Sequence, residues 1–96
     1  MNLRVGIPRE IKPMEGRVGL APAAVREIVR QGALVGIQRG AGEGSGYADQ
    51  AYVEAGADLL DDAVSLYEWA QLIVKVKEPL DEEVDLLRAD HLLFCY

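Results

Sequence analysis

LIVKVKEP, at Leu72–Pro79, predicts a buried β-strand that carries two lysines at its carboxyl end. Three apolar residues come first, Lys75 and Lys77 follow at alternate positions, and a proline then stops the strand. Open α/β sheets bind ligands in the crevice outside the carboxyl ends of their strands, so an ammonium group placed there suits an anionic ligand. Alternate residues share a face of a strand, but Lys75 lies further inside, and we expect a structural role for it.

Short apolar runs and helical patterns alternate along the rest of the chain. Strands are predicted at Leu3–Ile7, Leu34–Gln38, Leu59–Leu60 and Leu92–Tyr96, and helices at Pro22–Gln31, Ala48–Ala55, Asp61 to Tyr67 or Trp69, and Asp81–Leu87. This order is typical of an α/β fold with an open, mainly parallel sheet and flanking helices, as in Rossmann-like and flavodoxin-like domains. In the third helix, Val64, Tyr67 and Ala70 are expected to face the core.

The length of 96 residues suffices for one domain and excludes a two-domain enzyme within this chain. Half of the residues are hydrophobic, which argues against disorder. The lone Cys95 lies in an apolar run and is expected to be a small buried residue in a reducing compartment. The amino terminus has no secretory pattern, and no stretch reaches the ~20 apolar residues of a membrane span, so we expect a cytoplasmic protein without membrane attachment.

The net charge of −6 argues against nucleic-acid binding, which needs a basic footprint. The charges are unevenly distributed, however: residues 1–40 carry seven basic and three acidic side chains, and the remainder carries three basic and thirteen acidic ones. Positive potential therefore belongs to the amino-terminal part and to Lys75 and Lys77. For most of these charges, a solvated surface is the alternative interpretation.

Arg17 is the second candidate for anion binding. It follows the first predicted strand after a polar loop, Arg9–Gly16, that is bracketed by Pro13 and Gly16. A guanidinium can bind a carboxylate through two parallel hydrogen bonds, while an ammonium such as that of Lys77 presents a compact charge. Together the two residues predict a small carboxylate as the ligand.

The glycine-rich segment Gly40–Gly46 could be mistaken for a dinucleotide-binding loop. No frame gives the G-x-G-x-x-G spacing, because Ser45 or Tyr47 occupies the third glycine position. We therefore expect these glycines to allow sharp turns and close packing, and not to bind phosphate.

Five of these segments form a recognisable set: RVGIPRE at Arg4–Glu10, Arg17 with Val18, GAGEGS at Gly40–Ser45, Ala55–Ala57, and Leu72–Pro79. The set closely resembles the N-terminal domain of alanine dehydrogenases, a family related to the alpha subunit of proton-translocating NAD(P) transhydrogenase. The resemblance runs from Leu3 to Tyr96. Lys77 favours the dehydrogenases, since transhydrogenases typically have an uncharged residue at that position.

The resemblance implies that residues 1–96 are the substrate-binding domain of an NAD-dependent enzyme and stop before its NAD-binding domain. Such enzymes convert L-alanine reversibly to pyruvate and ammonia, and many are homo-oligomers, often hexamers. The resemblance places substrate binding on Arg17 and Lys77, and places no cofactor or metal ligand within the chain. The family's catalytic histidine is expected just after Tyr96, so the piece alone should be inactive. His91 precedes the last strand and is expected to be an exposed turn residue.

Two alternatives remain open at this stage. One is the N-terminal part of a transhydrogenase alpha subunit, and the other is a stand-alone module that binds an oxo acid or another subunit without catalysis. Ala21 is a smaller departure, because the family often has threonine before the proline at this helix start. Loss of such a side-chain cap costs ~1 kcal/mol.

Overall fold

The structure is a computed structural model that describes residues 3–10, 17–76, 83, 85–87 and 91–95. Within these residues, five parallel strands form one sheet in the order β3-β2-β1-β4-β5. The elements are β1 Arg4–Ile7, α1 Pro22–Arg30, β2 Leu34–Gln38, η1 Glu43–Ser45, α2 Asp49–Glu54, β3 Asp58–Leu60, α3 Ala63–Trp69, β4 Leu72–Lys75 and β5 Leu92–Cys95. This α/β architecture confirms the predicted fold class.

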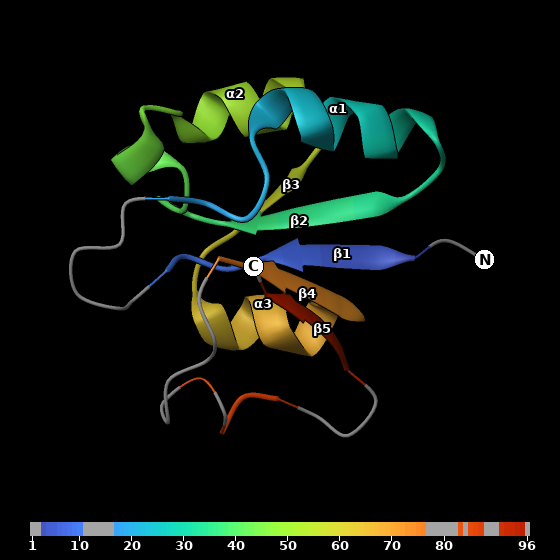
Figure 1. The fold of residues 1–96 in the computed structure, drawn as a ribbon, viewed down its shortest axis with the longest axis vertical. Coiled ribbons are helices and arrows are strands. Elements are labelled where there is room, and N and C mark those ends of the chain that lie inside the picture. The colour runs from blue at the N-terminus through green and yellow to red at the C-terminus, as the bar shows by residue number, and fades with distance from the viewer. Residues whose placement is uncertain (1–2, 11–16, 77–82, 84, 88–90, 96) are drawn as a thin grey trace.

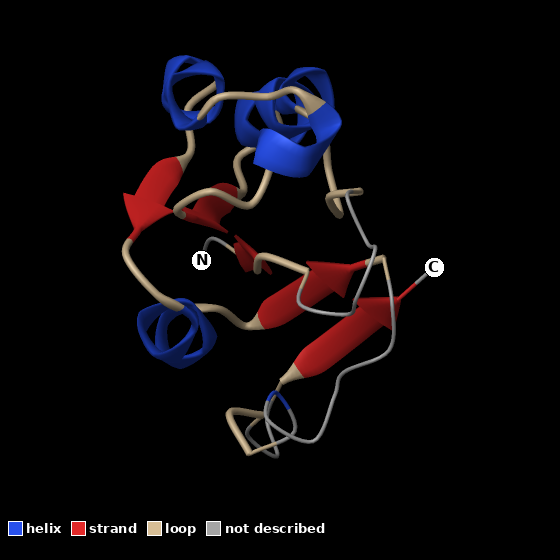
Figure 2. Cartoon of the chain, turned by 90° about the vertical axis from the view of Figure 1, so that its left-hand side faces the viewer, coloured by secondary structure: helices blue, strands red, loops and turns tan. Residues whose placement is uncertain are grey.

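Helices cover both faces of the sheet. α1 and α2 lie along one face and α3 lies along the other, as Figure 1 shows, and Figure 2 gives the same layers from the side. The strands alternate accordingly: Val5 and Ile7 of β1 belong to the core beneath α1 and α2, while Ile73 of β4 packs against Leu66 and Tyr67 of α3. None of the described helices is long and apolar enough to cross a membrane.

The order of the strands reverses between β1 and β4. From β1 the chain builds outward through β2 and β3, then returns to the other side of β1 to form β4 and β5. Val5 pairs with Leu72, and Gly6 pairs with Ile73. The carboxyl ends of β1 and β4 are therefore neighbours, and open α/β sheets bind ligands in the crevice at such a switch point.

Three predictions about burial are wrong, and two of them concern residues that were expected to be buried. Val64 is 50% exposed, because the buried stripe of α3 consists of Leu66, Tyr67 and Ala70, and Val64 lies to one side of it. Cys95 is exposed, because β5 is an edge strand whose residues are all exposed.

The third wrong prediction about burial concerns His91. His91 is half-buried instead of exposed: its Nε2 atom lies 2.7 Å from the carbonyl oxygen of Tyr67, and the two rings are in edge contact. The helix predicted at Asp81–Leu87 includes residues 81, 82 and 84, which lie outside the described part of the chain, and of the residues described there Glu83 is assigned as helical.

α1 begins at Pro22 without a side-chain cap. Ala21 occupies the N-cap position in extended conformation. We expect Ala21→Thr to raise the free energy of unfolding by ~1 kcal/mol, because the hydroxyl can accept a hydrogen bond from an amide of the first turn. Urea denaturation measures this change, with Ala21→Val as the control of matched shape. Equal stabilities of the Thr and Val variants would contradict the prediction.

Candidate functional site

A cleft of about 140 Å³ lies at the carboxyl edge of β1 and β2. Three charged residues after β1 line it, together with the start of the loop after β2: Arg9, Glu10, Arg17, Gly40, Ala41, Glu43 and Gly44. The structure thus places the predicted Arg17 in a cleft at the expected edge of the sheet. Arg9 was not predicted as a site residue, since nothing in the sequence separates it from the solvated charges around it.

The glycine-rich loop forms sharp turns, as the sequence predicts. Gly40 and Gly46 have positive φ angles of 82° and 85°, a conformation that favours glycine. The amide of Gly40 donates to the carboxylate of Asp49 at 2.9 Å, so a negative side chain lies at the start of α2. The Gly40 amide is therefore already bonded to a carboxylate and does not serve as a donor to a phosphate.

The segment that follows Arg17 crosses the end of β4. A Cβ atom placed on Gly19 would lie 2.5 Å from the carbonyl oxygen of Val74, so only glycine allows this approach. One residue further, the carbonyl oxygen of Leu20 accepts a 2.7 Å hydrogen bond from the hydroxyl of the buried Tyr52. These contacts hold the Arg17 segment beside the strand that leads to Lys77.

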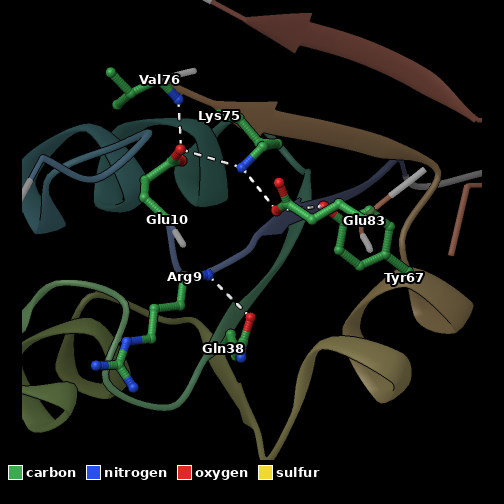
Figure 3. Close-up of polar contacts among 7 residues, drawn as sticks. All are labelled: Arg9, Glu10, Gln38, Tyr67, Lys75, Val76 and Glu83. Atoms are coloured by element: carbon green, nitrogen blue, oxygen red, sulfur yellow. Dashed lines mark hydrogen bonds and ion pairs between the residues drawn. The ribbon is translucent and has the colours of Figure 1, made fainter. Parts of the chain in front are cut away.

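Lys75 is buried within a group of charged side chains, shown in Figure 3. Its Nζ atom lies 3.1 Å from Oε1 of Glu10 and 2.9 Å from Oε2 of Glu83. The Tyr67 hydroxyl donates to the same oxygen of Glu83 at 3.3 Å. Burial, and then the charge of Glu83, raises the pKa of Tyr67 above its usual range, so the phenol stays protonated and remains a donor. This arrangement confirms the structural role predicted for Lys75.

Glu10 binds β4 through both of its carboxylate oxygens. Besides Lys75, it accepts a 3.0 Å hydrogen bond from the backbone amide of Val76. On the other side, the amide of Arg9 donates to the side-chain oxygen of Gln38 at the end of β2, at 2.9 Å. The segment after β1 is therefore held by both neighbouring strands (Figure 3).

Lys77 lies outside the residues that the structure describes, so its convergence with Arg17 stays a prediction. The residues on either side of the gap are nevertheless informative. Val76 directly precedes Lys77 and is held by Glu10, and the Arg17 segment packs on Val74 through Gly19. Described residues close in sequence to the two predicted binding residues, Gly19 to Arg17 and Val76 to Lys77, therefore both lie at the end of β4.

Comparisons with known proteins agree with this architecture. The family model described as alanine dehydrogenase/PNT, N-terminal domain, matches residues 6–96. The alanine dehydrogenase of Methanococcus maripaludis is 45% identical over 92 residues, which are 96% of this chain and 25% of that protein.

Solved structures give the same picture. A structure titled L-alanine dehydrogenase superimposes with a TM-score of 0.95 at 48% identity, and covers 98% of this chain and 26% of its own. The transhydrogenase from Sinorhizobium meliloti superimposes with a TM-score of 0.89 at 33% identity, over 96% of this chain and 26% of its own. The chain thus spans about a quarter of the length of these relatives.

Proposed function

Because the chain belongs to the alanine dehydrogenase/PNT N-terminal domain family, we propose that it is the substrate-binding domain of an NAD-dependent alanine dehydrogenase. The whole protein catalyses the reversible oxidative deamination of L-alanine to pyruvate and ammonia, in the cytoplasm and as a homo-oligomer. NAD binds to a domain outside residues 1–96, and the histidine that moves the proton follows Tyr96. The function of the present chain is to bind and orient L-alanine or pyruvate.

The observation that carries this proposal is the place of Arg17 in a cleft at the carboxyl edge of the sheet. A guanidinium there can bind the substrate carboxylate with two parallel hydrogen bonds. Lys77, which follows β4 by two residues in the sequence, supplies an ammonium for the keto oxygen of pyruvate. Its positive charge stabilises the negative charge that develops on this oxygen during hydride transfer.

Calorimetric titration of the 96-residue chain with pyruvate tests this proposal. We expect Arg17→Ala to weaken binding by about tenfold or more, because a hydrogen-bonded charge pair is lost. Arg26→Ala is the matched control: it removes the same charge from an exposed position on α1, and its affinity should equal that of the native chain. Absence of binding by the native chain, or equal affinities of the Arg17 and Arg26 variants, would contradict the proposal.

A transhydrogenase subunit is the second candidate, favoured by the likeness to the Sinorhizobium meliloti structure. The higher identity and TM-score of the L-alanine dehydrogenase structure support the first candidate. The two reactions differ in a direct assay of a full-length protein that contains this chain. Hydride exchange between two nicotinamide nucleotides without deamination of L-alanine would select the transhydrogenase.

A further inference from the structure

The side chain of Glu10 links the segment after β1 to the carboxyl end of β4. Its side chain is only 2% exposed, and its two oxygens bind two different groups, the ammonium of Lys75 at the end of β4 and the amide of Val76 just after it. A buried carboxylate is costly unless such partners satisfy it, so these contacts give the carboxylate a defined position. Glu10 therefore joins the two strands at the point where the sheet is expected to bind its ligand.

We propose that Glu10 is a positioning residue for the substrate site, an inference that rests on the proposed function. Its backbone leads into the loop that ends at Arg17, and its carboxylate holds the residue before Lys77. One side chain thereby joins the segment after β1, which leads toward Arg17 in the sequence, to Lys75 and Val76, which lead toward Lys77. Binding that needs both cations depends on this spacing, since displacement by about 1 Å can cost a large factor in a positioned site.

The residues that follow Arg17 are held by other contacts. Gly19 packs on the carbonyl of Val74, and Leu20 accepts the hydrogen bond from Tyr52. The described residues on both sides of residues 11–16 are thus held in place, Glu10 before them and Gly19 and Leu20 after Arg17. Loss of the Glu10 anchor should therefore shift Arg17 while the rest of the domain keeps its packing.

Glu83 offers a matched control within the same group of charges. Its carboxylate lies 2.9 Å from the same Lys75 ammonium, and its side chain is 5% exposed. It differs from Glu10 in its place along the chain: it follows β4, and it contacts Tyr67 of α3. Glu10→Gln and Glu83→Gln thus each remove one carboxylate charge beside Lys75 with little change in volume, but only Glu10→Gln weakens the link between the loop and β4.

The test is titration of the native chain and of both variants with pyruvate, after circular dichroism has verified that each is folded. We expect Glu10→Gln to weaken binding by about tenfold or more and Glu83→Gln to stay within about threefold of the native affinity. Native affinity in Glu10→Gln, or an equal loss in both variants, would overturn the proposal. Failure of the native chain to bind pyruvate would instead reject the proposed function.

Amide hydrogen exchange of the native chain tests the same inference without a substitution. The proposal expects the Val76 amide to be protected, and to become more protected when pyruvate binds, because the ligand holds together the two segments that Glu10 joins. Exchange of this amide at the rate of an exposed residue, with or without pyruvate, would overturn the proposal. This measurement keeps the inference testable even if a variant does not fold.

Discussion

Lys75→Met is expected to destabilise the fold by about 3–5 kcal/mol, because it leaves two buried carboxylates without their shared ammonium. Methionine matches the length of the lysine stem and fills the same space, so the loss comes from charge and not from a cavity. Small domains are stable by only about 5–15 kcal/mol. The variant should therefore lose a large share of the stability of a domain of this size.

Urea denaturation followed by circular dichroism measures this loss. The informative comparison is the triple variant Lys75→Met, Glu10→Gln, Glu83→Gln, in which the buried carboxylate charges are removed together with the ammonium. We expect this variant to recover much of the stability, since replacing a whole buried ionic group is far less costly than removing one partner. A Lys75→Met chain within about 1 kcal/mol of the native stability would show that the ammonium is not required.

The periodic segments of the fold could be predicted from the sequence, because local apolar patterns determine them. β2 has the predicted bounds, and β1 and α1 differ from prediction by a residue at one end. The predictions for Val64 and Cys95 failed because exposure depends on helix rotation and strand order, which only the packed sheet fixes. No local signal identifies an edge strand as apolar as β5.

The candidate site was predictable only in part. Arg17 could be placed at this edge because it follows a recognisable strand after a polar loop, and Lys75 could be assigned a structural role because it lies within one. Glu10 could not, since it lies in a run of charged residues, and its burial depends on a partner 65 positions away in the chain. Pairing between such distant residues is a tertiary property, so nothing in the local pattern separates Glu10 from solvated acids. The residue that joins the two segments of the site was therefore visible only in the structure.

Gly19→Ala is expected to have the second large effect, and it tests whether the close approach to β4 positions Arg17. The new Cβ atom would lie 2.5 Å from the carbonyl oxygen and 3.0 Å from the carbonyl carbon of Val74. These are backbone atoms of a paired strand, so the Arg17 segment must move and β4 cannot. We expect a loss of about 1–3 kcal/mol in stability and a weakening of pyruvate binding by up to about a hundredfold.

Gly32→Ala separates these two effects. Gly32 has a φ of 102° after the end of α1, and apart from its chain neighbours no atom of the described residues lies within 4 Å of a Cβ placed there. Alanine is strained at such an angle, so this variant should lose about 1 kcal/mol of stability while its affinity for pyruvate remains native. If both variants bound pyruvate as the native chain does, the contact between Gly19 and Val74 would contribute to packing and not to the position of Arg17. A loss of affinity confined to Gly19→Ala would instead mean that the end of β4 fixes where the guanidinium meets its ligand.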